Sequence, residues 1–289
     1  MLKGEIMNFD SLRCDGFSVT KINGLTVITD DRFSCRGVVH GFTTRHGGVS
    51  KGEFASLNLA YSQDRDDPRE NIISNFAILT KAFATSDECA VRTHQTHSDN
   101  IVADAPGGTG FTLPQFDTGV DGLISHTDGQ LVVARMADCL PILLYDTESH
   151  AVGAIHSGWK GTVQRIGAKA VRMMCDIYNS KESSILVSFG PSVGPCCYEV
   201  GEDFRQTFID EFGSDISSAF TSRNGSLYAD MRKINLRAMT DCGIPAENIA
   251  VYKPCTCCTP EHFYSYRRQK NCRGTMVAVI KCNLGDSHD

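Results

Sequence analysis

Residues 137–161 read ADCLPILLYDTESHAVGAIHSGWKG, and two apolar segments in this run enclose a short polar one. The segments Pro141–Tyr145 and Ala151–His156 are apolar enough to form buried strands, and Asp146–Ser149 has the composition of a turn. The pattern predicts a β-hairpin with a four-residue loop. The residues that suggest a function lie at the open end of this hairpin and in the segments around it.

Cys139 and His156 are predicted to face each other across the hairpin. In a register that pairs Tyr145 with His150, Cys139 lies opposite His156, and opposed side chains have Cβ atoms about 4.5 to 5.5 Å apart. A thiolate and an imidazole at that separation can share a metal ion or act as a nucleophile and its base. The alternative is a buried thiol beside a hydrogen-bonded histidine, and a slip of one residue would break the pairing.

His94 and His97 lie in the segment THQTHSD, just before another predicted strand. The local context favours an extended or turn conformation, in which odd spacing points the two rings to opposite sides. We therefore expect only one of them to reach Cys139 and His156, unless both form a surface pair without function. Two histidines and one cysteine form a zinc set with an open fourth position, which favours catalysis.

Glycine-rich turns follow two of the predicted strands. The segment SGWKG at 157–161 precedes a predicted helix, so backbone N–H groups and the helix end could hold an anion, and Lys160 favours phosphate. A tight bend without a ligand is the simpler interpretation. The turn at 190–199 could form a pocket wall, and the segment YSYRR at 264–268 suits stacking of a planar base with anion binding.

The remaining sequence predicts an α/β fold, a single domain over residues 1–289 with mixed β-sheets covered by helices, because strand-like and helical segments alternate without repeats or linkers. Further predicted strands are Leu25–Thr29, Val38–Thr43, Asn100–Ala103, Gly122–Ser125, Leu131–Arg135, Ile185–Gly190, Asn248–Tyr252 and Met276–Ile280. Predicted helices begin at Asp67, with Pro68 at the first position and Glu70 in a capping box, and at Gly161, continuing to Ile177; shorter ones cover Asp203–Phe212 and Asp230–Asp241. The order of the strands does not follow from the sequence.

Composition excludes several classes of protein. The 289 residues carry 28 Lys+Arg against 34 Asp+Glu and are 41% hydrophobic, which excludes a disordered chain. The absence of a long basic run argues against nucleic acid as a partner. The most apolar window, Leu131–Tyr145, is too short and too charged to cross a membrane, and the start MLKGEIMNFD lacks the apolar stretch of a secretory signal. We therefore expect a cytoplasmic protein without a membrane partner.

The thirteen cysteines are an odd number in a long chain without a visible signal, which favours a reducing compartment over a disulfide scaffold. Near the C-terminus, Cys255–Cys258 with His262 and Cys272 could be taken for a second zinc site. No paired Cys-x-x-Cys motif accompanies them, so we expect these cysteines to be core or surface thiols. Cys139 is the one thiol for which the sequence predicts a role.

Eight segments together resemble a known family. They are HGFTTRHGGVS at 40–50, SLNL at 56–59, QTH at 95–97, DGL at 121–123, ADCLP at 137–141, HSGWKG at 156–161, GPSVGPCCYEV at 190–200 and FYSYRR at 263–268. In this order they resemble the multicopper polyphenol oxidase or laccase-domain family, whose members are also described as purine nucleoside phosphorylases. The resemblance covers residues from about 36 to 281.

The resemblance implies a single α/β domain with a zinc site whose ligands are His97, Cys139 and His156. It implies phosphorolysis of adenosine, inosine, guanosine and S-methyl-5'-thioadenosine by inorganic phosphate, and deamination of adenosine. By motif position, the residues implied to line the site are Arg45, Asn58, Gln95, Asp138, Lys160, Ser265 and Arg267. Asp138, as a general acid or as a partner of a ligand, and Arg45 and Lys160 are the candidate catalytic residues, and the other four are candidates for substrate binding.

The chain departs from the family pattern near its last strand, where Arg273-Gly-Thr275 replaces the usual Thr-Gly-Arg. The anion contact of that arginine is therefore in question.

Three other functions are compatible with the sequence. A copper-dependent polyphenol oxidase is disfavoured because none of the nine histidines forms a His-x-His pair, although one copper could be held with Met136 as a distant axial ligand. A metal-free cysteine hydrolase would use Cys139 as nucleophile and His156 as base. A scaffold protein with a structural zinc is the third, and the oligomeric state is not indicated.

Overall fold

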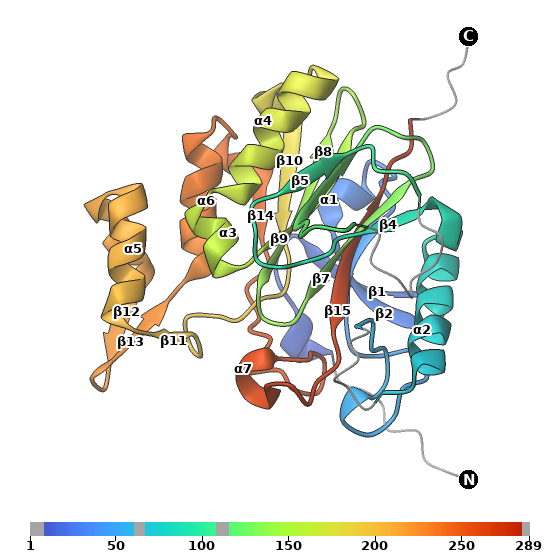
Figure 1. The fold of residues 1–289 in the computed structure, drawn as a ribbon, viewed down its shortest axis with the longest axis horizontal. Helices are drawn as coiled ribbons and strands as arrows, with labels where there is room; N and C mark the ends of the chain where they lie inside the picture. Colours follow the sequence, from blue (N-terminus) through green and yellow to red (C-terminus); the bar gives the residue numbers. More distant parts are fainter. Residues whose placement is uncertain (1–8, 61–66, 108–115, 285–289) are drawn as a thin grey trace.

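Strands whose side chains are buried along both faces form the centre of the molecule, so each needs a packed layer on either side. The computed structural model describes residues 9–60, 67–107 and 116–284. Two six-stranded sheets stack face to face, and helices cover their outer faces (Figure 1). This arrangement confirms the predicted α/β fold of mixed sheets covered by helices. The expectation about a signal segment falls on residues 1–8, which lie outside the described residues.

The first sheet has the order β1 (Phe17–Ile22), β2 (Leu25–Asp30), β3 (His40–Thr43), β15 (Met276–Lys281), β7 (Leu131–Met136) and β4 (Ala90–Arg92). The second has the order β14 (Ile249–Val251), β10 (Ile185–Phe189), β8 (Leu140–Asp146), β9 (Val152–Ser157), β6 (Gly122–Ser125) and β5 (Ile101–Ala103). A small third sheet contains β11 (Glu199–Val200), β13 (Ser226–Ala229) and β12 (Phe220–Arg223). Pairing is parallel for β4 with β7, β5 with β6 and β10 with β14, and antiparallel elsewhere in these sheets. Every segment predicted as a strand forms one.

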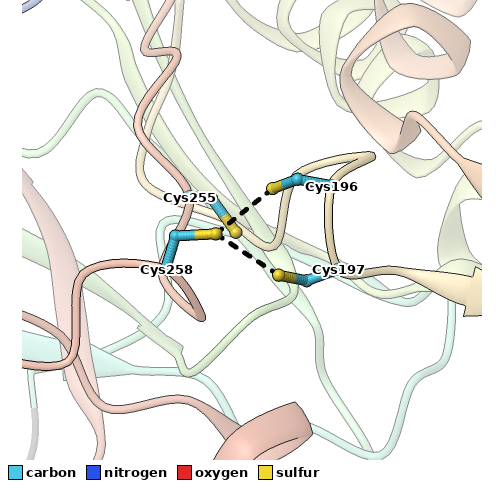
Figure 2. Close-up of side chains that lie close together, drawn as sticks. All are labelled: Cys196, Cys197, Cys255 and Cys258. Carbon is cyan, nitrogen blue, oxygen red and sulfur yellow. Dashed lines mark hydrogen bonds between the residues drawn. The ribbon is translucent and has the colours of Figure 1, made fainter.

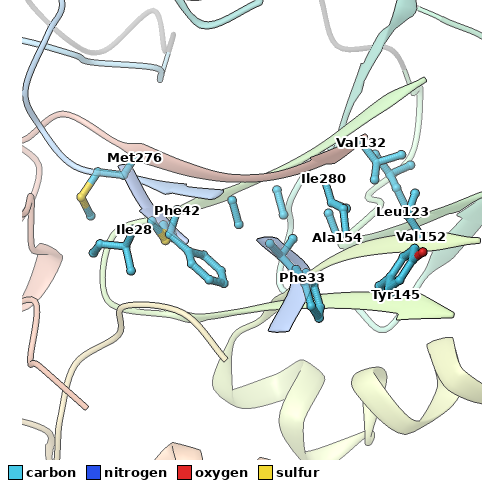
Figure 3. Close-up of a cluster of buried hydrophobic side chains, with 14 of the residues drawn as sticks. Ile28, Phe33, Phe42, Leu123, Val132, Tyr145, Val152, Ala154, Met276 and Ile280 are labelled. Atoms are coloured by element: carbon cyan, nitrogen blue, oxygen red, sulfur yellow. The ribbon is translucent and has the colours of Figure 1, made fainter. Parts of the chain in front are cut away.

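The main core lies between the two large sheets (Figure 3). Phe42 and Ile280 extend from the first sheet toward Tyr145 and Val152 of the second, and all four are buried. The helix α1 (Asp31–Ser34) adds Phe33 to the same layer. The second sheet, which carries the 137–161 hairpin, is therefore fixed against the first by apolar packing.

Helices complete the outer layers. On the outer face of the first sheet lies α2 (Arg69–Ala82), and on that of the second lie α4 (Ile166–Tyr178) and α6 (Met231–Asp241) (Figure 1). Beyond α6, α5 (Glu202–Phe212) forms a further apolar cluster. The short helices α3 (Trp159–Val163) and α7 (Tyr266–Gln269) lie next to the functional segments. Among the described residues, no helix combines the length and the apolar character needed to span a membrane.

Two of the predicted helices differ from the observed ones. The helix predicted from Gly161 to Ile177 is interrupted at Arg165, which has a left-handed backbone with φ of 54°. The Arg165 guanidinium forms ion pairs with Glu211 and Asp241, and these contacts stabilise the turn between α3 and α4. The predicted capping box before α2 is wrong because Pro68 is the capping residue.

Asp67 serves a different purpose from the predicted helix cap. Its buried carboxylate accepts hydrogen bonds from Ser50, Asn58 and Asn71. The side chain therefore joins the start of α2 to two upstream loops.

The hairpin forms as predicted, but its predicted register is wrong by two residues. Tyr145 pairs with Val152 and Pro141 with His156, so the loop is longer by two residues than predicted. The Asp146 carboxylate accepts hydrogen bonds from Glu148 N and Ser149 Oγ, which stabilises the longer turn. Because side chains alternate with a period of two, this shift leaves every residue on its predicted face.

We predict that Phe42→Ala lowers the free energy of unfolding by about 3 to 5 kcal/mol, because a fully buried ring is lost between the two sheets. Urea denaturation followed by circular dichroism measures this loss. The control is Ile73→Ala on α2, whose side chain is 44% exposed and whose removal should change stability by less than about 0.5 kcal/mol. Equal losses for the two variants would contradict the packing described here.

Candidate active site

A cavity of about 630 Å³ opens where β8 begins and β9 ends. His97, Cys139 and His156 line it, together with Asp138 and Gln95. The volume lies within the range of pockets that bind small molecules, about 300 to 1,000 Å³. The hairpin therefore delivers the predicted residues to a space that a nucleoside-sized ligand can enter.

His97, Cys139 and His156 come together despite the shift in register. Their ligand atoms all lie within 4.8 Å of one another, and Cys139 Sγ is 3.7 Å from His97 Nε2. His94 instead places its Nδ1 2.9 Å from the carbonyl of Phe116, so only one histidine of this segment joins the group, as the odd spacing predicts. Two imidazoles and one thiol at these separations fit a zinc ion with an open position.

Asp121 orients both histidines. Its carboxylate lies 2.7 Å from His156 Nδ1, which leaves the other ring nitrogen of His156 directed at the group. The same carboxylate accepts hydrogen bonds from the backbone N–H groups of Thr96, His97 and Ser98. A carboxylate behind a ligating histidine is the usual arrangement at metal sites in proteins. One buried side chain thus fixes the segment that carries His97 and the ring of His156.

The charges of the group depend on one another. Burial raises the pKa of the Cys139 thiol, but His156 and His97 lower it to about 6. Burial lowers the pKa of His156, but Cys139 and Asp121 raise it to about 9. Burial also opposes ionisation of Asp121, whose pKa falls to about 2 through hydrogen bonds from His156 and Ser98. At neutral pH the cysteine is therefore a thiolate, the form that binds metals and attacks electrophiles.

Gly158 allows His97 to approach. A Cβ at this position would lie 2.5 Å from His97 Cδ2, closer than side chains tolerate. His97 itself has φ of 62°, and its backbone N–H is held by Asp121. The glycine in the HSGWKG segment thus makes room for the ring of His97. This function is separate from the predicted anion contact.

Asp138 is a buried residue with φ of 95° whose carboxylate is fully engaged. It accepts hydrogen bonds from Thr256 Oγ1, Ser265 Oγ and the backbone N–H of Arg267. Asp138 therefore holds two distant segments beside Cys139, and this arrangement suits a positioning residue better than a general acid.

Three of the residues implied for substrate binding form hydrogen bonds with protein groups around the cavity. Gln95 lines the cavity, and its amide bonds to the backbone N–H and C=O of Arg135. Asn58 is fully buried and bonds to Asp67, Ala60 N and Thr275 N. Ser265 is also fully buried and bonds to Asp138.

Arg45 and Lys160 are not among the described residues that line the cavity. The Arg45 guanidinium donates to the carbonyls of Ala55, Glu53 and Pro260, so it braces loops. Lys160 is exposed, and its Nζ lies 5.7 Å from the ring centroid of Trp159. The helix that carries Lys160 is too short to give its N-terminus much electrostatic pull on an anion.

Other arginines lie at the cavity wall. Arg135, Arg267 and Arg273 all line the cavity, together with the aromatic rings of Trp159 and Tyr198. Arg267, implied by motif position, and Arg273, in the divergent segment near the last strand, are therefore both lining residues of the cavity. The lining combines positive charge with flat apolar surfaces.

Sequence reasoning missed the roles of Asp121 and Gly158. Both lie inside the quoted motifs, and an aspartate directly before a buried strand was the available signal for Asp121. The contacts that define their roles join segments far apart in the chain.

Comparison with known proteins identifies the family of this chain. Residues 39–283 match the family described as multi-copper polyphenol oxidoreductase laccase. A protein of Deinococcus radiodurans named purine nucleoside phosphorylase is 36% identical over 244 residues, which cover 84% of this chain and 88% of that protein. The purine nucleoside phosphorylase YlmD of Geobacillus stearothermophilus is 32% identical over 248 residues, 84% of this chain and 90% of YlmD.

A solved structure has the same fold. The crystal structure of the Bacillus licheniformis hypothetical protein YfiH superposes with a TM-score of 0.84 at 28% identity, covering 93% of this chain and all of that one. The family match spans most of the chain and includes each residue of the His97, Cys139 and His156 group. The chain therefore belongs to the multi-copper polyphenol oxidoreductase laccase family.

Proposed function

We propose that this protein is a zinc-dependent purine nucleoside phosphorylase. The observation that carries the proposal is the group of His97, Cys139 and His156 at the wall of a cavity lined by arginines and aromatic rings. The names of the relatives from Deinococcus radiodurans and Geobacillus stearothermophilus support it. The proposed substrates are adenosine, inosine, guanosine and S-methyl-5'-thioadenosine with inorganic phosphate, and adenosine is also deaminated.

The donor set favours zinc over copper. Two imidazoles and a thiolate, with Asp121 behind His156, match zinc sites that keep one position open. A multicopper oxidase needs additional clusters of histidines, and among the described residues the second group of three or more possible metal ligands consists of cysteines alone. When bound, zinc would supply a Lewis acid at the cavity wall, where it suits activation of water for deamination.

The arginines of the cavity lining are suited to bind phosphate. Phosphorolysis forms a bond between a phosphate oxygen and the anomeric carbon and breaks the bond from that carbon to the purine nitrogen. Arg135, Arg267 and Arg273 line the cavity and can hold the phosphate dianion through charge-assisted hydrogen bonds. We propose that these three residues bind the phosphate, whereas Arg45 braces loops through their carbonyls and Lys160 lies over the ring of Trp159.

The aromatic rings of the cavity lining are suited to bind the purine. Trp159 and Tyr198 present flat surfaces in the cavity lining, and a purine stacks on such surfaces. Gln95 and Asp138 hold the cavity wall in shape through their contacts with Arg135 and Arg267, so we assign both to positioning.

A metal-free cysteine hydrolase is the second candidate, because Cys139, His156 and Asp121 have the order of a nucleophile, base and orienting acid. The lowered pKa of Cys139 favours this chemistry also. His97 distinguishes the two functions, since a second imidazole nitrogen beside the thiolate serves a metal and has no part in such a triad. Stoichiometric zinc that protects Cys139 from iodoacetamide would exclude the hydrolase.

The proposed function predicts a phosphate-dependent cleavage of inosine. Purified protein with measured zinc content should convert inosine to hypoxanthine and ribose 1-phosphate only when phosphate is present, as followed by chromatography. Cys139→Ala should abolish the conversion because the thiolate ligand is lost. Cys89→Ala, which removes an exposed thiol outside the cavity lining, is the matched control and should retain activity. Hypoxanthine formed equally without phosphate would show hydrolysis and contradict the assignment.

The orienting role of Asp121 predicts a change in zinc affinity. Asp121→Asn should weaken zinc binding at this group about 10- to 100-fold, because the amide cannot hold His156 and the His97 segment as the carboxylate does. Competition with a chromophoric chelator measures the change. Asp104→Asn is a suitable control, since Asp104 also accepts a backbone hydrogen bond, from His126, away from the cavity. Unchanged zinc affinity in Asp121→Asn would refute the orienting role.

A further inference from the structure

Four cysteines gather at a second place, formed by two segments that are far apart in the sequence (Figure 2). Cys196 and Cys197 come from the turn before β11, and Cys255 and Cys258 come from the loop after β14. Their sulfur atoms all lie within 4.8 Å of one another. We propose that these four thiols bind one Zn²⁺ ion as a structural site, separate from the cavity.

Both segments form tight turns that direct their sulfurs inward. In the first, Cys197 N donates to the carbonyl of Gly194 at 3.0 Å, and in the second, Cys258 N donates to the carbonyl of Cys255 at 3.2 Å. The two turns are joined directly, because Gly194 N donates to Cys255 Sγ at 3.1 Å. Backbone N–H groups that point at cysteine sulfur stabilise the thiolate form and are common around metal-bound cysteines.

Gly194 also keeps the centre of the cluster open. A Cβ at this position would lie 3.2 Å from Cys196 Sγ and 3.2 Å from Cys255 Cβ. A larger residue would therefore press on the space that the sulfurs enclose. This arrangement is the counterpart of Gly158 beside His97.

The distances between the sulfurs favour a single metal ion over the alternatives. Cys258 Sγ lies 3.4 Å from Cys196 Sγ and 3.3 Å from Cys197 Sγ, so it stands equally near two possible disulfide partners and is bonded to neither. Sulfurs around one zinc at about 2.3 Å form a tetrahedron with edges of about 3.8 Å. A cluster of several irons would hold its cysteines on different metal atoms and therefore further apart.

Guanidinium groups brace both turns. Arg232 is buried and donates to the carbonyls of Ser192 and Pro254, which come just before the two turns, so its positive charge lies beside both cysteine segments. Arg223 donates to the carbonyl of Cys196, and Arg268 donates to the carbonyl of Cys257. Each turn is thus fixed by its own guanidinium group.

The site would hold one wall of the cavity. Val193 and Tyr198, which line the cavity, flank the first turn, and Tyr198 N donates to the carbonyl of Gly194. Thr256, between the two cysteines of the second turn, donates to the Asp138 carboxylate. A zinc ion joining the turns would therefore stabilise the segments that meet beside Cys139 without contacting the substrate.

The cluster differs in its members from the second zinc site considered from the sequence. His262 and Cys272, considered with the C-terminal cysteines, have no place in it, and the partner of Cys255 and Cys258 is the adjacent pair Cys196 and Cys197. Cys257 lies in the same loop but outside the group of four, which makes it a matched control.

Zinc stoichiometry tests the proposal. Protein purified under reducing conditions and dialysed against metal-free buffer should contain two zinc ions per chain by mass spectrometry of the metal. Cys258→Ser should lose one of them and Cys257→Ser neither. Cys139→Ala should keep the ion at the four cysteines, so failure of this proposal and failure of the proposed function are distinguishable.

Two results would overturn the proposal. One is a zinc content in Cys258→Ser equal to that of Cys257→Ser. The other is a disulfide between Cys258 and either Cys196 or Cys197 in the unreduced protein, mapped by peptide mass. If Cys258→Ser does not fold, Co²⁺ loaded into Cys139→Ala gives the answer, since four thiolates produce intense sulfur-to-cobalt absorption and its absence would refute the site.

Discussion

The buried carboxylate of Asp121 is the interaction on which the active-site geometry depends. It accepts hydrogen bonds from three successive backbone N–H groups before β5 and from the ring of His156 in β9. Burying a charge is costly unless it is fully hydrogen-bonded, and here the partners are themselves the elements of the site. The carboxylate therefore couples the position of His97 to the orientation of His156.

Ten of the twelve strands in the two large sheets, and the meeting of Cys139 with His156, were predictable because they follow from local patterns. β1, β4 and the third sheet were not predicted, and His97 was named only by the family resemblance. Apolar runs bounded by turns identify strands, and the period of two decides which side chains share a face. For this reason an error of two residues in the hairpin register still left His156 on the face that meets Cys139. The odd spacing of His94 and His97 separated the two rings in the same way.

Features set by contacts between distant segments were not predictable. The break at Arg165 depends on carboxylates of α5 and α6, and the role of Asp67 depends on two upstream loops. Motif position placed Arg45 among the functional residues, but its guanidinium is engaged by loop carbonyls. The four-cysteine cluster was missed because its halves are about 60 residues apart, as Cys196 and Cys258 show.

The two cysteine-containing groups have different proposed roles. The group at the cavity combines a thiolate with imidazoles and keeps an open side, which suits chemistry, and the all-cysteine group is closed, which suits structure. Anomalous diffraction from crystals, recorded on both sides of the zinc absorption edge, tests the central claim most directly. We predict a zinc peak about 2.0 to 2.3 Å from His97, Cys139 and His156 and open to the cavity. The absence of a peak among these three residues in zinc-replete crystals would contradict the account.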